Sequence, residues 1–327
     1  MLNVRTPFRI TFFGGGTDYP IWYRQNGGKT INACIDKFCY ISIRELPPFF
    51  DYKWRLRYFM TEEVSSIEKI KHPSIRECLK YFNINLGLEI VHQGDLPSRS
   101  GLGSSSAFTV SMINALTGFE GKLISKRDLA LKAIEIEQEK IREAVGSQDQ
   151  VAASYGGINY TEYSDLNEFN VYPIKLNNID LKKLENHLLL CFTGFTRNAS
   201  EIAETQINLT KSKKIDLNYM LSICEEGYRA FGGKNDFLSE IGRLLDEQWK
   251  IKRGLTELIS NSHIDEIYET AKKNGAMGGK LLGAGGGGFM LFLAAPEFHT
   301  KIKDALADKM FVPFKFDFNG SKIIYFS

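Results

Sequence analysis

The stretch PSRSGLGSSSA, residues 97–107, decides the fold of this chain. It stands between a strand-like run at 86–92 and a helical pattern from Ser104 that keeps apolar side chains on one face. Glycines let the backbone turn its N–H groups toward one point, and the first helical turn adds unpaired donors and a positive dipole end. Such a turn binds phosphate groups. A serine-capped helix after a flexible turn has the same pattern, so both interpretations stay open from these residues alone.

The glycines are not arranged as in two common nucleotide-binding loops. In residues 97–107 no GK[ST] triplet follows the glycines, as a Walker A loop requires, and this segment does not have the spacing GxGxxG after a strand. Further glycine clusters lie at 14–16, 156–157 and 278–288. Since such clusters mark turns or a close approach of backbone to ligand, they predict an extensive binding site.

The order of the remaining elements predicts an α+β protein. Strands are expected at 4–13, 29–44, 54–60, 86–92, 158–163, 188–193, 289–294 and 322–326. Helices are expected from 104, over 125–144, from 149 to 155, within 199–274 and over 297–306. Strands grouped early and helices grouped late favour α+β, with a lobe boundary between 175 and 185.

Length and composition restrict the class of protein. A chain of 327 residues suits two packed lobes, and its net charge of +2 gives no reason to expect a nucleic-acid or membrane partner. The N-terminus lacks a signal-peptide layout and no apolar run is long enough to span a bilayer, so we expect a soluble, cytoplasmic protein. Five cysteines without metal spacing predict buried free thiols. They are Cys34, Cys39, Cys78, Cys191 and Cys224.

Three segments resemble the motifs of one family. Residues 97–107 resemble the phosphate-binding motif PxxxGLGSSAA of the GHMP kinases, which include galacto-, homoserine, mevalonate and phosphomevalonate kinases. Residues 6–19, TPFRITFFGGGTDY, resemble its first motif, which in galactokinases reads roughly PGRVNLIGEHTDY. Residues 280–289, KLLGAGGGGF, resemble the third motif. Because all three occur in family order, the chain is identified as a member.

The resemblance implies a fold, a nucleotide and a cofactor. The fold is the two-lobed GHMP kinase fold, with an N-terminal ribosomal-protein-S5-like lobe at 1–180 and a C-terminal ferredoxin-like lobe at 181–327. The nucleotide is ATP, with Mg²⁺ as cofactor. The residues implied to bind it are Pro97, Ser100, Gly101, Leu102, Gly103, Ser104, Ser105 and Ser106. Ser105, the second serine of the run, matches the family's hydroxyl ligand for Mg²⁺.

Two carboxylates, one on the second predicted helix and one at the start of the third, are candidates for the chemistry. Taken alone, Glu135, Glu137 and Glu139 read as a solvated helix face, and Asp149 reads as a helix cap. Phosphoryl transfer needs one carboxylate on Mg²⁺ and usually another near the attacking hydroxyl. The text IEQE…VGSQDQVAA resembles galactokinase-like members, which implies a metal ligand at Glu137 and the catalytic base at Asp149.

The first motif is the expected sugar-binding side. Arg9 alone would be a surface arginine and Asp18 a turn aspartate. The resemblance places Arg9 beside the reacting hydroxyl, where its charge would stabilise the transferring phosphoryl group. It places the substrate against a set of residues from the first and third motifs. These are Gly15, Gly16, Thr17, Asp18, Gly285 and Gly286. Gly15-Gly16 replaces the Glu-His of galactokinases, so galactose itself is not expected.

Within the family, the sequence is most similar to D-glycero-D-manno-heptose 7-phosphate kinases. The similarity lies in PFRITFFGGGTDYP, VGSQDQVAASYGG and TGFTRNASEIAETQ, and in late stretches at 242–253 and 275–280. It implies phosphorylation of the anomeric C1 hydroxyl to a 1,7-bisphosphate, toward nucleotide-activated heptose for lipopolysaccharide or capsule. A phosphorylated substrate needs a cation, and Arg197 is the candidate, with a solvated turn arginine as the alternative.

Other functions stay open from the sequence. A galactokinase-, fucokinase- or hexosamine-kinase-like enzyme would keep the same motifs. A catalytically weak sugar-binding regulator of this fold would be expected to lose Asp149 or Arg9, and both are present. The expected partner is a small sugar phosphate, with no nucleic acid and no membrane. The oligomeric state is left open, a homo-oligomer included.

Overall fold

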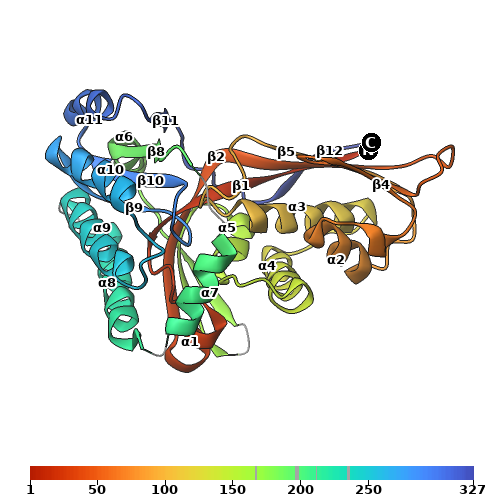
Figure 1. Ribbon diagram of the computed structural model, residues 1–327, viewed down its shortest axis with the longest axis horizontal. Coiled ribbons are helices and arrows are strands. Elements are labelled where there is room, and N and C mark those ends of the chain that lie inside the picture. Colours follow the sequence, from red (N-terminus) through yellow and green to blue (C-terminus); the bar gives the residue numbers. More distant parts are fainter. Residues whose placement is uncertain (166–167, 196–198, 211, 234–235) are drawn as a thin grey trace.

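The computed structural model describes residues 1–165, 168–195, 199–210, 212–233 and 236–327. In these ranges the chain forms two sheets, each with its own helices (Figure 1). The larger sheet contains β1 Leu2–Phe13, β2 Gly28–Glu45, β3 Trp54–Arg57, β4 Thr61–Val64, β5 Leu88–Gly94, β6 Ile158–Tyr163, β7 Phe169–Pro173 and β12 Lys322–Phe326. The smaller sheet contains β8 Leu188–Phe192, β9 Ala276–Leu281, β10 Phe289–Ala294 and β11 Met310–Val312.

The helices lie on defined faces of these sheets. They are α1 Pro20–Asn26, α2 Pro73–Tyr81, α3 Ser104–Phe119, α4 Lys126–Glu135, α5 Gln148–Tyr155, α6 Asn178–His187, α7 Ala199–Leu209, α8 Lys214–Gly232, α9 Phe237–Arg253, α10 Ser262–Lys273 and α11 His299–Ala305. Helices α2, α3 and α4 lie on one side of the larger sheet, and α8, α9 and α10 lie beside the smaller one (Figure 1).

The larger sheet is organised around β1. Its strand order is β12-β1-β2-β5-β3-β4, and β6 pairs with β2 beside β7. From Thr6 to Phe13 the side chains of β1 are all buried, because β2 and α3 pack against the strand. α3 is accordingly buried from Ser106 to Gly118, on every side. A helix that is apolar all round needs such a position inside the protein.

The smaller sheet has the antiparallel order β11-β8-β10-β9. All residues of β10 are buried, as its continuous apolar sequence FMLFLA predicts. α9 packs on β9 through a stripe that includes Ile241, Leu245 and Trp249. This i, i+4, i+8 spacing places the three side chains on one helical face.

The predicted helix over 125–144 is wrong in its second half. α4 ends at Glu135 and is followed by a π-helical turn, Ile136–Ile141, which stops at Arg142 with φ +61°. π-Turns occur often at functional sites, because the extra residue re-aims a side chain. Here the turn carries Glu137 into the interior.

Other boundaries also differ from the expectation. The strand predicted over 54–60 ends at Arg57, where the chain turns back to form β4 antiparallel to β3. The elements α1, α2, α6, β7, β9 and β11 were not predicted as separate elements. They are short or glycine-rich, so hydrophobic periodicity gives little signal for them. β12 pairs with β1 although it follows the smaller sheet in the chain, and the lobe division at 180/181 stays a prediction.

The cysteine prediction is confirmed, since all five thiols are buried and free. Among the described residues, no helix combines the length and the apolar character needed to cross a bilayer.

Two glycine-rich loops join the sheets. Gly101, before α3, has φ +83°, and Gly283, between β9 and β10, has φ +71°. A β carbon on Gly283 would lie 2.5 Å from Gly101 Cα, and one on Gly101 would lie 2.5 Å from Leu282 O. The Phe289 N–H donates to Ser100 O at 3.1 Å. The two loops therefore touch through backbone alone, and only glycine fits at both positions.

Replacing Gly283 by Ala should lower the free energy of unfolding more than replacing Gly121 by Ala. Both glycines have nearly the same φ, +71° and +72°, but a β carbon on Gly121 meets nothing within 4 Å. Gly121→Ala should cost about 1–2 kcal/mol for the left-handed backbone. Gly283→Ala should add about 1–3 kcal/mol for the clash. Urea unfolding of the two variants measures this difference, and equal losses would contradict the loop contact.

Candidate functional site

Arg9 connects three separate segments at the centre of the site. Its side chain, only 4% exposed, leaves β1 and binds Asp149 with two donors, Nε to Oδ1 and Nη2 to Oδ2, both at 2.7 Å. Its Nη1 donates to Gly101 O at 2.5 Å. The backbone N–H of Arg9 also donates to Leu102 O at 3.0 Å. The first motif, the phosphate-binding loop and α5 thus meet at one guanidinium, as a bidentate pair allows.

Asp149 is available for chemistry in this arrangement. It lies in the first turn of α5 and is 24% exposed. Each carboxylate oxygen that accepts from Arg9 keeps a second lone pair, so the group can still accept a proton from a hydroxyl. A β carbon on Gly103 would lie 3.4 Å from Asp149 Oδ2 and 3.2 Å from Arg9 Cγ. The phosphate-binding loop therefore lies directly against the Arg9–Asp149 pair.

The loop before α3 has the features of an anion site. Gly101 and Gly103 have positive φ, and Gly103 is the N-cap of the 16-residue helix without any side-chain cap. No acidic residue lies in the first turn. The first backbone donors and the positive dipole end are thus left for a ligand, which fits a phosphate chain. Among the other predicted nucleotide residues, Leu102 and Ser100 are buried, and Pro97 is exposed.

Glu137 is a buried carboxylate that is only partly satisfied. Its Oε2 accepts from Ser106 Oγ at 2.8 Å and from Gln150 Nε2, while its Oε1 has no hydrogen-bond partner among the described residues. Burial, with the negative charge of Glu143 second, raises the pKa of Glu137 to about 8. An unpartnered buried carboxylate oxygen fits a bound cation. The described residues contain no cluster of three or more His, Cys, Asp or Glu side chains for a metal. A site with few protein ligands suits Mg²⁺, since this ion is often bound by one or two carboxylates together with substrate phosphates.

The serine beside Glu137 is not the predicted one. Ser106 is buried and contacts the carboxylate, whereas Ser105 is exposed. The metal role of Ser105 stays a prediction. Ser104 and Ser105 lie on the first turn of α3 with the loop donors, where the nucleotide role of all three serines was expected.

Asp18 ties the first motif to α5. It is buried, with Oδ1 accepting from Gly16 N at 2.9 Å and Oδ2 from Gln148 N at 3.2 Å. Its carbonyl accepts from Ser147 N at 3.0 Å. Burial and the charge of Asp149 raise the pKa of Asp18, although the two N–H donors oppose this. The loop that contains Asp18 is therefore fixed next to Asp149.

Three of the predicted substrate residues have packing roles in the structure. Thr17 is buried, and its hydroxyl lies within hydrogen-bond distance of Gly14 O in its own turn and of Lys29 O in β2. Gly285 and Gly286 are buried against Ile259, and Gly286 N donates to Ile259 O at 2.9 Å. Direct sugar contacts for these residues stay predictions. Arg197 lies outside the described residues.

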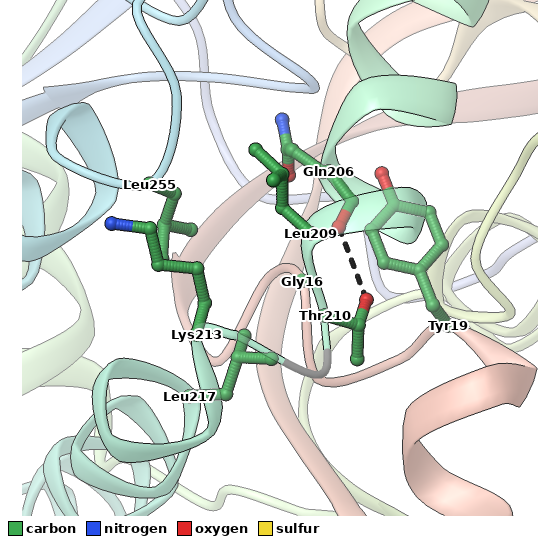
Figure 2. A pocket seen from close by; sticks show the side chains of 8 residues that line it. All are labelled: Gly16, Tyr19, Gln206, Leu209, Thr210, Lys213, Leu217 and Leu255. Atoms are coloured by element: carbon green, nitrogen blue, oxygen red, sulfur yellow. Dashed lines mark hydrogen bonds between the residues drawn. The ribbon is translucent and has the colours of Figure 1, made fainter.

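Gly15 and Gly16 are half-buried, and Gly16 borders a pocket on the side of the first motif that faces α7 and α8 (Figure 2). The lining residues are Gly16, Tyr19, Gln206, Leu209, Thr210, Lys213, Leu217 and Leu255. Gln206 Nε2 donates to Ala284 O at 2.6 Å, which connects α7 to the third motif. Among these lining side chains, Lys213 is the one cation.

Several residues of the site were missed from the sequence. Gln150 is a neighbour of the predicted Asp149 and donates to Glu137. Ser106 was expected at the nucleotide, but its hydrogen bond to Glu137 was not. Lys252 and Lys280 are buried, and their amines reach backbone carbonyls beside the site. A signal existed for Lys252, because it follows Trp249 by three residues on the apolar stripe of α9. A lysine in that stripe is unusual unless its charge has a function.

Comparisons with known proteins agree with this geometry. The family model described as GHMP kinases N terminal domain matches residues 70–157, and the one described as GHMP kinases C terminal matches residues 234–311. The chain belongs to the GHMP kinase family. This confirms the family and the fold expected from the motifs. The matched ranges contain the phosphate-binding loop, Glu137, Asp149 and the third motif.

Individual relatives of this GHMP kinase include sugar kinases. It is similar to a D-glycero-alpha-D-manno-heptose 7-phosphate kinase of Campylobacter jejuni, 29% identical with 90% of each chain covered. It is similar to a bifunctional fucokinase/GDP-fucose pyrophosphorylase of Arabidopsis thaliana, 24% identical over 89% of this chain and 30% of that protein. A crystal structure of a D-glycero-D-manno-heptose 1-phosphate kinase from Bacteroides thetaiotaomicron has a TM-score of 0.75, 22% identity and full coverage of both chains.

Replacing Glu137 by Gln should change how the stability of the metal-free kinase depends on pH. The unfolded chain releases this proton near 4.5, whereas the folded chain holds it to about 8. Between these values the folded state binds more protons, so the contribution of Glu137 to the free energy of unfolding falls as pH rises. Glu137→Gln removes that fall.

Urea unfolding of both proteins between pH 5 and 8 measures the difference, in the presence of a chelator. Added Mg²⁺ should then raise the stability of the wild type at pH 8 and leave Glu137→Gln unchanged. Ser104→Ala, at the half-buried first residue of α3, tests a hydroxyl for which no contact with Glu137 is seen among the described residues, and it serves as the control. Identical pH profiles, or the same Mg²⁺ effect in both proteins, would refute the metal assignment.

Proposed function

We propose that this GHMP kinase transfers the terminal phosphate of ATP to the anomeric C1 hydroxyl of D-glycero-D-manno-heptose 7-phosphate. The product would be the 1,7-bisphosphate, a precursor for nucleotide-activated heptose in surface glycans, made in the cytoplasm. The observation that carries the kinase chemistry is the Arg9–Asp149 pair lying against Gly103 of the phosphate-binding loop. The similarity to the heptose 7-phosphate kinase of C. jejuni supports the choice of substrate.

Asp149 is the proposed base. The acceptor hydroxyl gives its proton to the Asp149 carboxylate while its oxygen forms a bond to the terminal phosphorus of ATP. The bond from that phosphorus to the bridging oxygen breaks, and ADP leaves with the electron pair. Arg9 holds the carboxylate in place through two hydrogen bonds and keeps a positive charge next to the developing charge. Positioning and electrostatics are the main contributions in phosphoryl transfer.

Glu137 and the loop would handle the nucleotide. The first-turn donors of α3 receive the phosphate chain, and Ser105 and Glu137 are the proposed ligands of Mg²⁺. A bound Mg²⁺ supplies neutralisation of phosphate charge. Glu137 has a free oxygen for this role because Ser106 and Gln150 occupy only the other one.

The acceptor is proposed to lie between Asp18 and the pocket beside Gly16. Gly15 and Gly16 present no side chains there, so a seven-carbon sugar phosphate meets less obstruction than it would in a galactokinase. Its phosphate needs a cation. Lys213 lines the pocket, and among the described residues its amine contacts Gly254 O at 2.9 Å and the Asp216 carboxylate at 3.7 Å. We propose Lys213 for this contact, and Arg197 stays a second candidate from the sequence.

A fucose kinase is the alternative function, because the pocket is largely apolar. Leu209, Leu217 and Leu255 line it and would suit the methyl group of a deoxysugar. The similarity to the fucokinase of A. thaliana supports the same idea. An ADP-release assay with Mg-ATP against heptose 7-phosphate, heptose, fucose and galactose distinguishes these substrates.

Replacing Asp149 by Asn should lower kcat by about 10²–10⁴, the usual contribution of a positioned base. Nucleotide affinity should stay close to that of the wild type, because Asp149 acts on the acceptor. A variant that keeps more than about a tenth of wild-type kcat would defeat the base assignment. Since Arg9 is nearly buried and loses its partner, the melting temperature of the variant must be checked alongside.

Replacing Lys213 by Ala should lower kcat/KM for heptose 7-phosphate and leave activity on free heptose nearly unchanged. A charge-assisted contact is typically worth about 1.5–3 kcal/mol, and at this part-exposed site we expect the lower end, roughly tenfold. Lys214→Ala, an exposed neighbour outside the pocket, is the matched control. Equal losses on both sugars would assign Lys213 to packing, and no loss would move the phosphate site elsewhere.

A further inference from the structure

Two lysines lie buried behind the glycine-rich loops, and the proposed reaction does not use them. Lys252, at the end of α9, is 4% exposed, and Lys280, in β9, is 1% exposed. The Lys252 amine donates to Gly283 O and, at 3.4 Å, to Leu281 O. The Lys280 amine donates to Phe12 O at 3.2 Å. In the part of the chain that the structure describes, neither amine forms an ion pair with a carboxylate.

These contacts connect both amines to the site. Gly283 is the residue that touches Gly101 of the phosphate-binding loop, so Lys252 holds the loop that supports the nucleotide site. Phe12 lies at the end of β1, just before the Gly14–Gly16 loop. The hydrogen bond from Lys280 therefore contacts the strand that carries Arg9. The two side chains come from different elements of the smaller lobe and converge on the first and third motifs.

The acids near this cluster are already engaged. Asp149 uses both oxygens for Arg9, and Asp18 accepts from two backbone N–H groups. Burial, followed by the charge of Arg9, lowers the pKa of Lys252 to about 8, although Asp18 and Asp149 oppose this. Burial and the charges of Lys252 and Arg9 likewise lower the pKa of Lys280, opposed by Cys224 and Asp18. When protonated, the two amines and Arg9 therefore place three buried cations beside two engaged carboxylates, and burial makes the charged form of each amine costly.

An excess of buried positive charge raises the free energy of the empty protein, because the ammonium groups lose hydration that carbonyl oxygens only partly replace. A negatively charged ligand bound next to the cluster relieves this cost. The free energy that the empty protein spends on burying these charges therefore favours binding of an anion.

We propose that Lys252 and Lys280 are a buried counter-charge for a phosphate group bound beside Arg9, with Lys252 acting also by positioning the Gly283 loop. The ligand is a phosphate group, from the nucleotide or from the acceptor. This inference rests on the proposed kinase function for the choice of ligand, and on the described burial and contacts for the site. Both lysines are positioning residues, since neither reaches the surface of the site.

The first test compares Lys280→Met and Lys252→Met with Lys250→Met. Lys250 is on the same helix, is 59% exposed and pairs with Asp246, which makes it a matched control. Calorimetry measures the affinity of each protein for inorganic phosphate and for a non-hydrolysable ATP analogue, with no sugar present. We expect Lys280→Met and Lys252→Met to bind both ligands about tenfold more weakly than the wild type. The control, Lys250→Met, should bind them with wild-type affinity.

Stability separates this role from a structural one. Removing a buried, uncompensated charge in favour of an apolar side chain is often neutral or stabilising. We therefore expect Lys280→Met to melt at the wild-type temperature or above it while it binds phosphate more weakly. A lower melting temperature with unchanged phosphate affinity per folded molecule would overturn the proposal, as would wild-type affinity in both methionine variants.

The pH dependence gives a readout that packing would not change. Phosphate affinity should fall as pH rises through about 8, where Lys252 loses its charge. The phosphate itself gains negative charge with rising pH, so the ligand cannot cause this fall. Glu137 becomes charged in the same range, and Lys252→Arg, which stays cationic, removes that ambiguity by keeping its affinity above pH 8. The same fall in both proteins would refute Lys252.

The source of the phosphate follows from a comparison of ligands. A larger loss for the ATP analogue than for ADP assigns the counter-charge to the terminal phosphate of the nucleotide. A larger loss for heptose 7-phosphate than for heptose assigns it to the acceptor. If wild-type protein does not bind heptose 7-phosphate, the proposed substrate fails, but the nucleotide measurements still decide the role of the lysines. No loss with any of these ligands overturns it.

Discussion

The buried guanidinium of Arg9 is the constraint on which the site depends. A cation that is 4% exposed needs a charged partner and further acceptors, and it finds them in Asp149 and Gly101 O. These partners lie on α5 and on the loop before α3. Satisfying one side chain therefore fixes the distance between the proposed base and the phosphate-binding loop. Precise placement is what catalysis of phosphoryl transfer requires.

Glycine gives the second constraint, which acts between the loops that join the two sheets. Gly101 and Gly283 meet backbone to backbone, and Gly103 leaves space over the Arg9–Asp149 pair. A side chain at any of these positions would separate the loops or cover the carboxylate. Gly101, Gly103 and Gly283 therefore share one cause, the close approach of chain segments around the Arg9–Asp149 pair, whereas Gly156 is fixed by its contact with Gly320.

Several charged groups in this volume are only partly satisfied by hydrogen bonds or ion pairs within the described protein. Glu137 has a carboxylate oxygen without a partner, and two buried amines have only carbonyl oxygens. Each lowers the stability of the protein alone. Functional sites commonly retain such costs, because groups that satisfied them internally would no longer bind a cation or a phosphate.

The sequence by itself determined the family, the α+β fold and the glycine- and serine-rich loop before α3, because glycine turns and strand patterns are local signals that neighbouring residues carry. It also named Arg9, Asp18, Glu137 and Asp149, although only as matches to motifs. Tertiary structure decided that Arg9 pairs with Asp149 across 140 positions and that a π-turn buries Glu137. It also showed that Lys252 and Lys280 are buried beside the site, because their burial depends on contacts between elements distant in the chain. The sequence offered only the position of Lys252 on the apolar stripe of α9 and that of Lys280 in the third motif.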